Sequence, residues 1–257
     1  MKQKLVIILC LTVSHLLAQN KTDELNIGIG QKQLKLSNIA PSGVNGTRYG
    51  IDFLHTHRLK SNHNVLFSYF AELGFSKLNR GEEIVKYHLF DGGLNAGVFW
   101  LRHLPVKSEK INLYAGGGGL FDSDIYDSYY GDFSWNALKY ECWQWFLSPS
   151  VYFLGNYHLK KFNFRFNYSM PVFSAGFQSG TFIENKKKVL IPNTFVFFPK
   201  RFYPQADIAV SYPVSSNDKT ECRLQLKYAL EQLVYTGYPY ERKANNMFKL
   251  GMIWTMR

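Results

Sequence analysis

Hydrophobic and polar side chains alternate along residues 162–170 in a way that only an extended chain separates cleanly. One face holds Phe162, Phe164, Phe166, Tyr168 and Met170, and the other holds Asn163, Arg165, Asn167 and Ser169. Successive side chains of a strand point to opposite faces. A row of large aromatic residues opposite a row that carries a charge suits a strand with lipid outside and water inside. The segment therefore predicts a transmembrane β-strand.

The same alternation recurs along the chain. It is clearest in residues 206–212, 222–230 and 248–256, is present in 49–53, 65–74 and 143–153, and is less regular in 25–35, 87–103 and 111–121. No segment after residue 18 has the roughly 20 continuous apolar residues that a transmembrane helix needs. We therefore predict an all-β fold, a closed antiparallel transmembrane β-barrel of about ten strands, an even number between about 8 and 12. A soluble β-sandwich or lipocalin-like barrel is the alternative, but so many aromatic rows would overfill a small core.

The links between these segments alternate in length. Short links are expected at 60–64, 105–110, 158–161 and 215–219, and long links at 36–46, 122–140, 178–203 and 235–246, with the brief link 79–83 as an exception. Bacterial barrels have short turns on the periplasmic side and longer loops outside. The pattern therefore predicts short periplasmic turns, long extracellular loops and both termini in the periplasm.

The first 18 residues predict a signal peptide. Lys2 and Lys4 precede the apolar run 5–13, and Leu17 and Ala18 form a plausible cleavage end. The apolar run is too short to span a hydrocarbon core of roughly 30 Å. Residues 19–257 then form a single barrel domain, and we expect it in the bacterial outer membrane.

Composition and charge narrow the partners. The chain is 46% hydrophobic and 17% aromatic, which suits side chains that collect at a membrane interface. Its formal net charge of +11 would suit a nucleic-acid partner. Because the protein is predicted to be exported, we expect it to contact the phosphates of outer-membrane lipid, including lipopolysaccharide, and not nucleic acid. Lys186, Lys187 and Lys188 are the best local candidate for that contact, and a solvated loop is the alternative.

The alternation assigns side chains to the two sides of the wall. Those expected to face lipid are Phe162, Phe164, Phe166, Tyr168, Leu224, Leu226, Tyr228, Leu250 and Met252, with Trp100, Trp143, Trp145 and Trp254 as interface girdles. Those expected to line the lumen are Asp52, Glu72, Arg165, Asp207, Arg223, Lys227, Glu231 and Lys249. The lumen set holds both signs, so either ion pairs plug the barrel or a hydrated row lines a pore. Because eight-stranded barrels fill with side chains and porins of 16 or more strands hold a channel, about ten strands favour closure or a narrow conduit.

Four further features bear on possible sites in the chain. Asp122, Asp124, Asp127, Tyr129 and Tyr130 are expected in one outer loop, where carboxylates could take calcium or sugar hydroxyls and rings could stack on a sugar; a hydrated surface loop is the alternative. His55 and His57 share a strand face, but no third ligand is evident, so we expect no metal site and no cofactor. Cys142 and Cys222 are expected near opposite ends of the barrel, and hence unbridged. Glycines 116–119 either leave open space in the lumen, or neighbouring aromatic rings fill that space.

The leader ending before Gln19, the alternating strands and the amphipathic last strand together resemble a small outer-membrane β-barrel protein of a Bacteroidota-type bacterium. The sequence favours a non-enzymatic barrel with a mostly plugged polar lumen, whose long outer loops bind or shield. A narrow channel for small solutes or anions and a lipid-modifying enzyme are the alternatives. The ligand and the oligomeric state are not specified.

Overall fold

The computed structural model describes residues 18–36, 40–59, 62–82, 85–131, 139–184, 187–190, 194–197, 201–236 and 241–256. Within these residues no helix is long and apolar enough to cross a membrane. The predicted signal peptide, residues 1–18, lies outside the described residues except for Ala18, where the first strand begins.

The described chain is built from strands alone. Their bounds are β1 (Ala18–Leu36), β2 (Ala40–Leu59), β3 (Asn62–Glu82), β4 (Val85–Leu104), β5 (Ile111–Gly131), β6 (Lys139–Leu159), β7 (Phe162–Pro171), β8 (Phe173–Glu184), β9 (Lys187–Leu190), β10 (Thr194–Phe197), β11 (Arg201–Phe202), β12 (Gln205–Ser216), β13 (Thr220–Tyr235) and β14 (Glu241–Met256). Every pairing between them is antiparallel.

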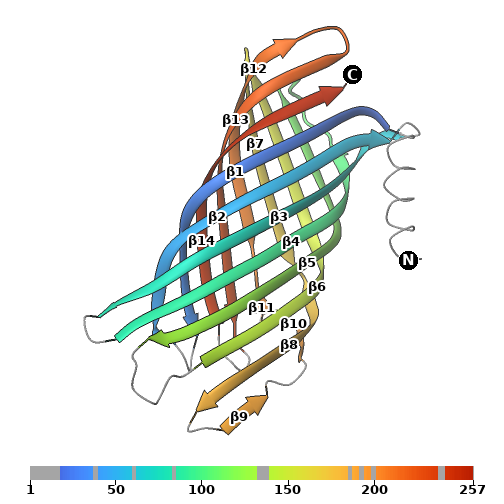
Figure 1. Ribbon diagram of the computed structural model, residues 1–257. Helices are drawn as coiled ribbons and strands as arrows, with labels where there is room; N and C mark the ends of the chain where they lie inside the picture. The colour runs from blue at the N-terminus through green and yellow to red at the C-terminus, as the bar shows by residue number, and fades with distance from the viewer. Residues whose placement is uncertain are drawn as a thin grey trace, which may run out of the picture.

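The wall of the molecule is a closed barrel (Figure 1). In the described part of the chain β1 to β7 follow one another around the wall, β12, β13 and β14 complete it, and β14 pairs with β1. The prediction of a closed antiparallel barrel of about ten strands is therefore confirmed. The remaining strands extend the wall at one end, where β8 lies beside β6, β9 and β10 beside β8, and β11 beside β13.

The two ends of the barrel differ. At one end, here called the turn end, the links are residues 60–61, 105–110, 160–161 and 217–219, and β1 begins and β14 ends there. Local chemistry explains two of these turns. Asn217 Oδ1 accepts hydrogen bonds from the backbone N–H groups of Lys219 and Thr220 at 3.0 and 2.7 Å, and Lys160 takes the left-handed φ of 54°. The opposite end is called the loop end.

The strands run further than the alternation of apolar residues predicts. β1 to β6 are each 19 to 21 residues long. The expected long link 36–46 is therefore wrong, since only residues 37–39 separate β1 from β2. The other three long links are also shorter than expected. Strands β5 and β6 take up most of 122–140, β8 to β11 take up most of 178–203, and β14 begins within 235–246. On β1 the outward face changes from exposed Leu25, Ile27 and Ile29 to Gln31 and Gln33. The strands thus continue past the apolar region with polar residues on both faces, which hides them from a search for apolar rows.

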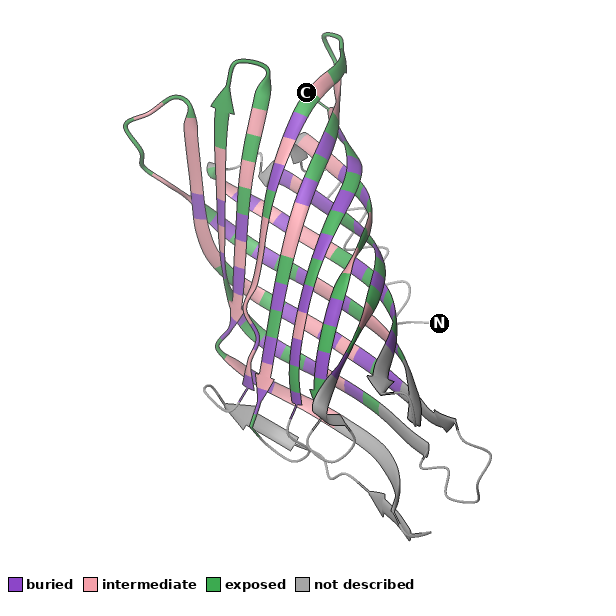
Figure 2. Ribbon diagram, turned by 90° about the vertical axis from the view of Figure 1, so that its left-hand side faces the viewer, coloured by how far each residue is buried: buried purple, intermediate pink, exposed green. Residues whose placement is uncertain are grey.

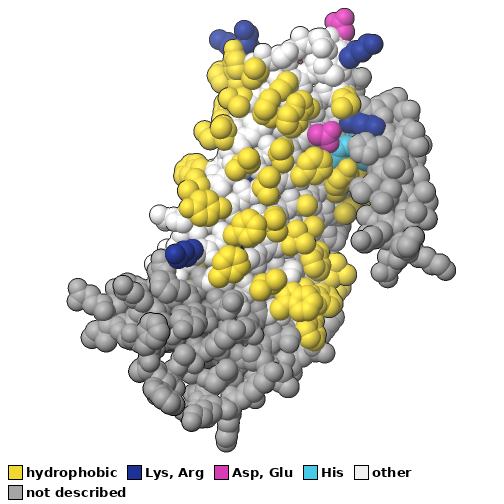
Figure 3. All heavy atoms as spheres, in the orientation of Figure 1, with side chains coloured by type: hydrophobic (Ala, Val, Ile, Leu, Met, Phe, Trp, Pro, Cys, Tyr) yellow, Lys and Arg dark blue, Asp and Glu magenta, His cyan; other side chains and the backbone are white. Residues whose placement is uncertain are grey.

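The outward face carries a belt of exposed hydrophobic side chains (Figure 3). Ile27 is 65% exposed, Phe248 61% and Leu250 58%. Buried and exposed residues alternate along the same strands (Figure 2). Soluble monomers rarely expose a contiguous apolar surface of this extent, so the molecule has the surface of a barrel that stands in lipid rather than of a lipocalin-like barrel.

Four consecutive glycines in β5 lie where the barrel packs most tightly. A Cβ on Gly118 would collide with the carbonyl oxygen of Val98 and lie 2.8 Å from Phe99 Cδ1, whereas a Cβ on Gly119 would meet nothing within 4 Å. The ring of Phe99 is fully buried and packs on Tyr152, with 4.4 Å between ring centroids. Neighbouring rings therefore fill the space that the inward glycines leave.

Gly118→Ala is expected to destabilise the barrel by about 1–3 kcal/mol, because the new methyl group overpacks the site against Phe99. Gly119→Ala is the matched control. Its methyl group points outward into open space, so the expected change is small or slightly stabilising. Urea unfolding of both variants in lipid vesicles measures the difference, and equal midpoints for the two variants would contradict the packing described above.

Candidate functional site

The inward-facing residues turn the lumen into a network of paired charges. All eight residues predicted to line the lumen face the interior: Asp52, Glu72, Arg165, Asp207, Arg223, Lys227, Glu231 and Lys249. Their alternation with outward residues on β2, β3, β7, β12, β13 and β14 puts them there. What matters for function is which of them meet.

At mid-height, two lysines each pair with a carboxylate, and one of the two carboxylates lies close to both lysines. Lys227 Nζ donates to Asp52 Oδ2 at 2.6 Å, and Lys249 Nζ donates to Glu72 Oε2 at 2.6 Å. Lys249 Nζ also lies 3.4 Å from Asp52 Oδ2, so Asp52 bridges the two ammonium groups. Gly28 on β1 makes room for this arrangement, since a Cβ there would lie 2.5 Å from Lys249 Cγ. Buried charges are tolerated where they are paired in this way.

Aromatic rings fill the other side of the same cross-section. Phe99 from β4 packs between Tyr152 from β6 and Phe70 from β3, with ring centroids 4.4 and 6.1 Å apart. Phe70 and Tyr152 line the same small cavity of about 60 Å³ as Asp52, Glu72, Lys227 and Lys249. We call these four charged residues and three rings the seal. This cavity has room for water molecules rather than for a solute.

Arg165 lies just toward the turn end from the seal and is paired. Its Nη1 and Nη2 both donate to the carboxylate of Glu24, the second at 2.8 Å. Glu24 comes from β1, is almost fully buried and also accepts from Asn26 Nδ2 at 2.7 Å. Close by, Asn167 Nδ2 donates to Asp207 Oδ1 at 2.9 Å. The bidentate geometry is the strong form of an arginine–carboxylate contact.

A second charge network fills the lumen toward the loop end. Arg201 Nη2 donates to Asp122 Oδ2 at 2.5 Å, and Lys243 Nζ donates to Asp124 Oδ2 at 2.8 Å. Tyr126 Oη and Gln144 Nε2 donate to Glu241 at 2.5 and 3.0 Å, and Asn245 Nδ2 donates to Glu231 Oε2 at 2.6 Å. Every one of these carboxylates is buried.

Arg48 extends the charges of the seal toward the loop end. Its Nη2 lies 3.5 Å from Glu72 Oε1 and its Nη1 lies 3.8 Å from Asp91 Oδ2, while Asp91 also pairs with Lys32. Paired charges therefore lie both at mid-height and toward the loop end.

The predicted loop ligand site is wrong in its placement. Asp122 and Asp124 lie in β5, face the lumen and are engaged by Arg201 and Lys243. They were misplaced because β5 continues to Gly131, beyond its apolar part. Asp127, Tyr129 and Tyr130 also belong to β5, but their side chains lie outside the described residues.

Sequence reasoning missed several members of the network, namely Glu24, Lys32, Arg48, Asp91, Arg201, Glu241 and Lys243. Lys32, Glu241 and Lys243 sit on strand portions whose outward neighbours, Gln31, Gln33 and Arg242, are polar, so the two faces look alike in sequence. Extending the strict two-residue period through the whole of each strand is the signal that would have found them.

The outward residues stand where the alternation predicts. Phe162, Phe164, Phe166, Leu224, Leu226, Leu250 and Met252 are exposed on the outer face, and Tyr168 and Tyr228 are half-buried there. Trp143 and Trp145 lie toward the loop end, and Trp100 and Trp254 toward the turn end. Contact of these residues with lipid and with its interfaces stays a prediction.

His55 and His57 lie on the outward face of β2 near the turn end, and the side chains of both are buried. His55 Nδ1 lies 2.5 Å from Asp23 Oδ1, and His55 Nε2 lies 3.1 Å from His57 Nδ1. The ring of Tyr69 stacks on His55 with 4.7 Å between centroids. Among the described residues no group of three potential metal ligands occurs, and these two rings are engaged in an aromatic and hydrogen-bonded cluster.

The predicted lysine cluster and one of the two cysteines lie wholly or partly outside the described residues. Lys186 lies outside the described residues, as do the side chains of Lys187 and Lys188 in β9. Cys222 is a free cysteine at the turn end of β13, and Cys142 lies near the loop-end start of β6 with its side chain outside the described part.

Comparison with protein-family models gives no match, and no curated protein is significantly similar in sequence. The fold is similar to that of solved outer-membrane barrels. The outer membrane protease OmpT from Escherichia coli superposes with a TM-score of 0.61 at 9% identity, over 93% of this chain and 97% of that chain. The translocator domain of the autotransporter NalP from Neisseria meningitidis gives a TM-score of 0.47 at 12% identity, over 94% and 91%. At such identities the first likeness shows a common fold and nothing about activity.

Proposed function

We propose that this chain is a bacterial outer-membrane barrel with a sealed lumen, a non-enzymatic protein that binds or shields at its loop end and conducts no solute. The fold shared with an outer-membrane barrel and the exposed apolar belt support the location. The short turns lie at the end of the barrel where β1 begins and β14 ends, which supports a periplasmic position for the turn end. The signal peptide, the Bacteroidota-type origin and the lipid-phosphate contact of Lys186–Lys188 remain predictions within this proposal.

The seal is the observation that carries the proposal. Lys227 and Lys249 each meet a carboxylate at 2.6 Å, so neither presents an unneutralised cation to a passing anion. Rings from β3, β4 and β6 pack together beside these ion pairs. A conduit at this level would require separating buried ion pairs, which is strongly unfavourable when one partner is left alone.

Removing an ion pair from the seal is expected to open a leak. In the double variant Glu72→Ser with Lys249→Ser, both charges leave together and small hydroxyl groups replace two long side chains. The matched control is Glu221→Ser with Arg223→Ser, which removes an ion pair of 2.7 Å at the turn end, outside the seal. Potassium efflux from vesicles should stay at background for the wild type and the control, and rise several-fold for the seal variant.

The alternatives are distinguished by the same measurement. Fast efflux through the wild type, unchanged by either double substitution, would support a narrow channel and contradict the sealed lumen. Folding of each variant is checked by the heat-dependent shift of the barrel on a gel, so that a failure to insert is not mistaken for a closed barrel.

A further inference from the structure

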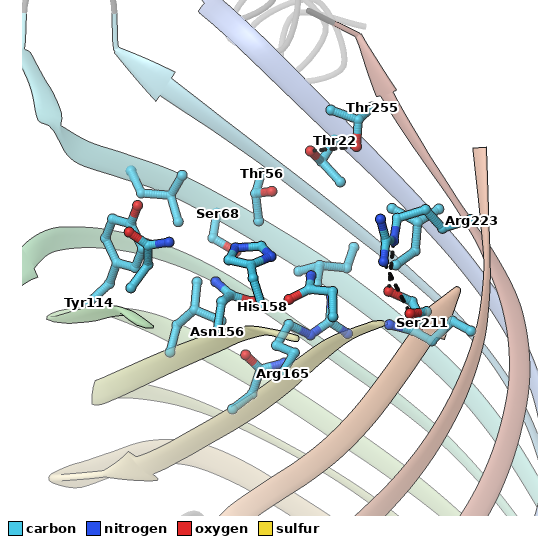
Figure 4. A pocket seen from close by; sticks show the side chains of 18 of the residues that line it. Thr22, Thr56, Ser68, Tyr114, Asn156, His158, Arg165, Ser211, Arg223 and Thr255 are labelled. Carbon is cyan, nitrogen blue, oxygen red and sulfur yellow. Dashed lines mark hydrogen bonds between the residues drawn. The ribbon is translucent and has the colours of Figure 1, made fainter. Parts of the chain in front are cut away.

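A second, larger cavity lies inside the barrel at the turn end (Figure 4). Its volume is about 500 Å³, within the range of about 300–1,000 Å³ that small-molecule sites occupy. Side chains from opposite walls converge on it, among them Ser68 of β3, Asn156 of β6, Arg165 of β7 and Arg223 of β13. His158, at the end of β6, is exposed at its rim.

Buried polar atoms lie beneath the lining of this cavity. Ser68 is 1% exposed and Asn167 is 4% exposed. Within the described part of the chain, Ser68 Oγ, Asn167 Oδ1 and Arg165 Nε have no hydrogen-bond partner and almost no accessible surface. The groups that can meet a ligand are therefore the half-buried amides of Asn112 and Asn156.

The charges around the cavity cancel locally. Arg165 is engaged by Glu24 through two hydrogen bonds, and Arg223 Nη1 donates to Glu221 Oε1 at 2.7 Å. Arg223 also donates to Ser211 Oγ at 3.0 Å. Because both guanidinium groups already hold a carboxylate, the cavity does not favour an anion. The amides of Asn112 and Asn156 offer donors and acceptors together, as a neutral polar ligand requires.

Most apolar side chains of the lining come from β2, β3, β5 and β6, namely Leu54, Leu66, Leu154, Tyr114 and Tyr152, whereas β7, β12 and β13 contribute only polar ones. A ligand that satisfies both walls needs a hydrocarbon face on one side and hydrogen-bonding groups around its edge. Sugar rings have this form, and an acetamido substituent adds a donor, an acceptor and a methyl group.

We propose that the turn-end cavity binds a neutral sugar of one or two rings that carries hydroxyl and acetamido groups. Asn112 and Asn156 bond its edge, and the leucine side of the cavity packs against its face. The seal closes the inner end of the cavity, so the sugar binds and leaves through the turn end. This binding does not depend on the sealed lumen being correct, because a conducting barrel could hold the same sugar.

Titration of the purified protein in lipid nanodiscs with N,N′-diacetylchitobiose, followed by calorimetry, tests the site. Saturable binding is expected for the wild type. Asn156→Leu should weaken it about threefold to tenfold, the effect of losing one hydrogen bond. Asn95→Leu is the matched control, since Asn95 is also an asparagine that faces inward but lies outside this cavity.

Three results would overturn the proposal. The first is the absence of saturable binding to wild-type protein that shows the heat-dependent gel shift. The second is an equal loss of binding in Asn95→Leu and Asn156→Leu. The third is displacement of the sugar by inorganic phosphate, which would make the cavity an anion site. Ion efflux is measured separately, so a failure here leaves the sealed lumen standing and the reverse also holds.

Discussion

Phe164→Arg should keep most of the chain out of the membrane. Phe164 is 38% exposed on the outer face of β7, and its ring lies 6.2 Å from that of Tyr157 on β6. A cation on the lipid face costs about 2–4 kcal/mol at the bilayer midplane, and the upper value would lower the ratio of folded to unfolded protein roughly a thousandfold. The fraction of protein in detergent-extracted outer membranes that shows the heat-dependent gel shift measures the effect.

Phe164→Leu is the control for this substitution. It shortens the side chain but keeps the outer face apolar, so we expect near-normal insertion. Normal insertion of the arginine variant would mean that residue 164 does not face lipid, and the outward belt would then need another explanation. A loss in both variants would point to packing against Tyr157 instead.

Asp52→Ala should strongly destabilise the folded barrel. The substitution removes the carboxylate that Lys227 and Lys249 share at 2.6 and 3.4 Å. Removing one partner from a buried pair costs about 3–5 kcal/mol, because the remaining charge is left buried. We expect about 3 kcal/mol here, at the lower end, since Lys249 keeps Glu72 and Lys227 lies 3.8 Å from Glu24. Urea unfolding in lipid vesicles, followed by tryptophan fluorescence, gives the change.

The double variant Asp52→Leu with Lys227→Leu separates charge from packing. Replacing both partners of a buried pair by apolar residues is often close to neutral. The double variant should therefore lose less stability than Asp52→Ala alone, a non-additivity that two independent sites would not produce. A double variant less stable than the single one would show that shape, and not charge pairing, holds this part of the seal.

The barrel was predictable because its defining signal is local. A two-residue period in segments such as 162–170 and 248–256 fixes which side chains share a face, and closure then follows from the need to pair every edge strand. The inward set from Asp52 to Lys249 followed from the same period. Strand length did not, since beyond Ile29 the outward residues of β1 are polar and a row of apolar residues no longer marks the strand.

The partners within the lumen could not be read from the sequence. Arg165 meets Glu24 across 141 positions of the chain, and Lys249 meets Glu72 across 177. Alternation says that a residue points inward, but the strand tilt and stagger of the closed barrel decide which residues reach the same height. Asp122 and Asp124 are a case of strand length instead: β5 continues past its apolar part to Gly131, and the closed barrel brings both carboxylates against Arg201 and Lys243.

Single-channel recording of the wild-type protein in a planar bilayer tests the sealed lumen most directly. With Asp52, Glu72, Lys227 and Lys249 paired beside the rings of Phe70, Phe99 and Tyr152, we predict a silent baseline across both voltage polarities, and openings only in the Glu72→Ser, Lys249→Ser double variant. Steady openings of wild-type protein whose folding is verified by the gel shift would contradict the sealed barrel.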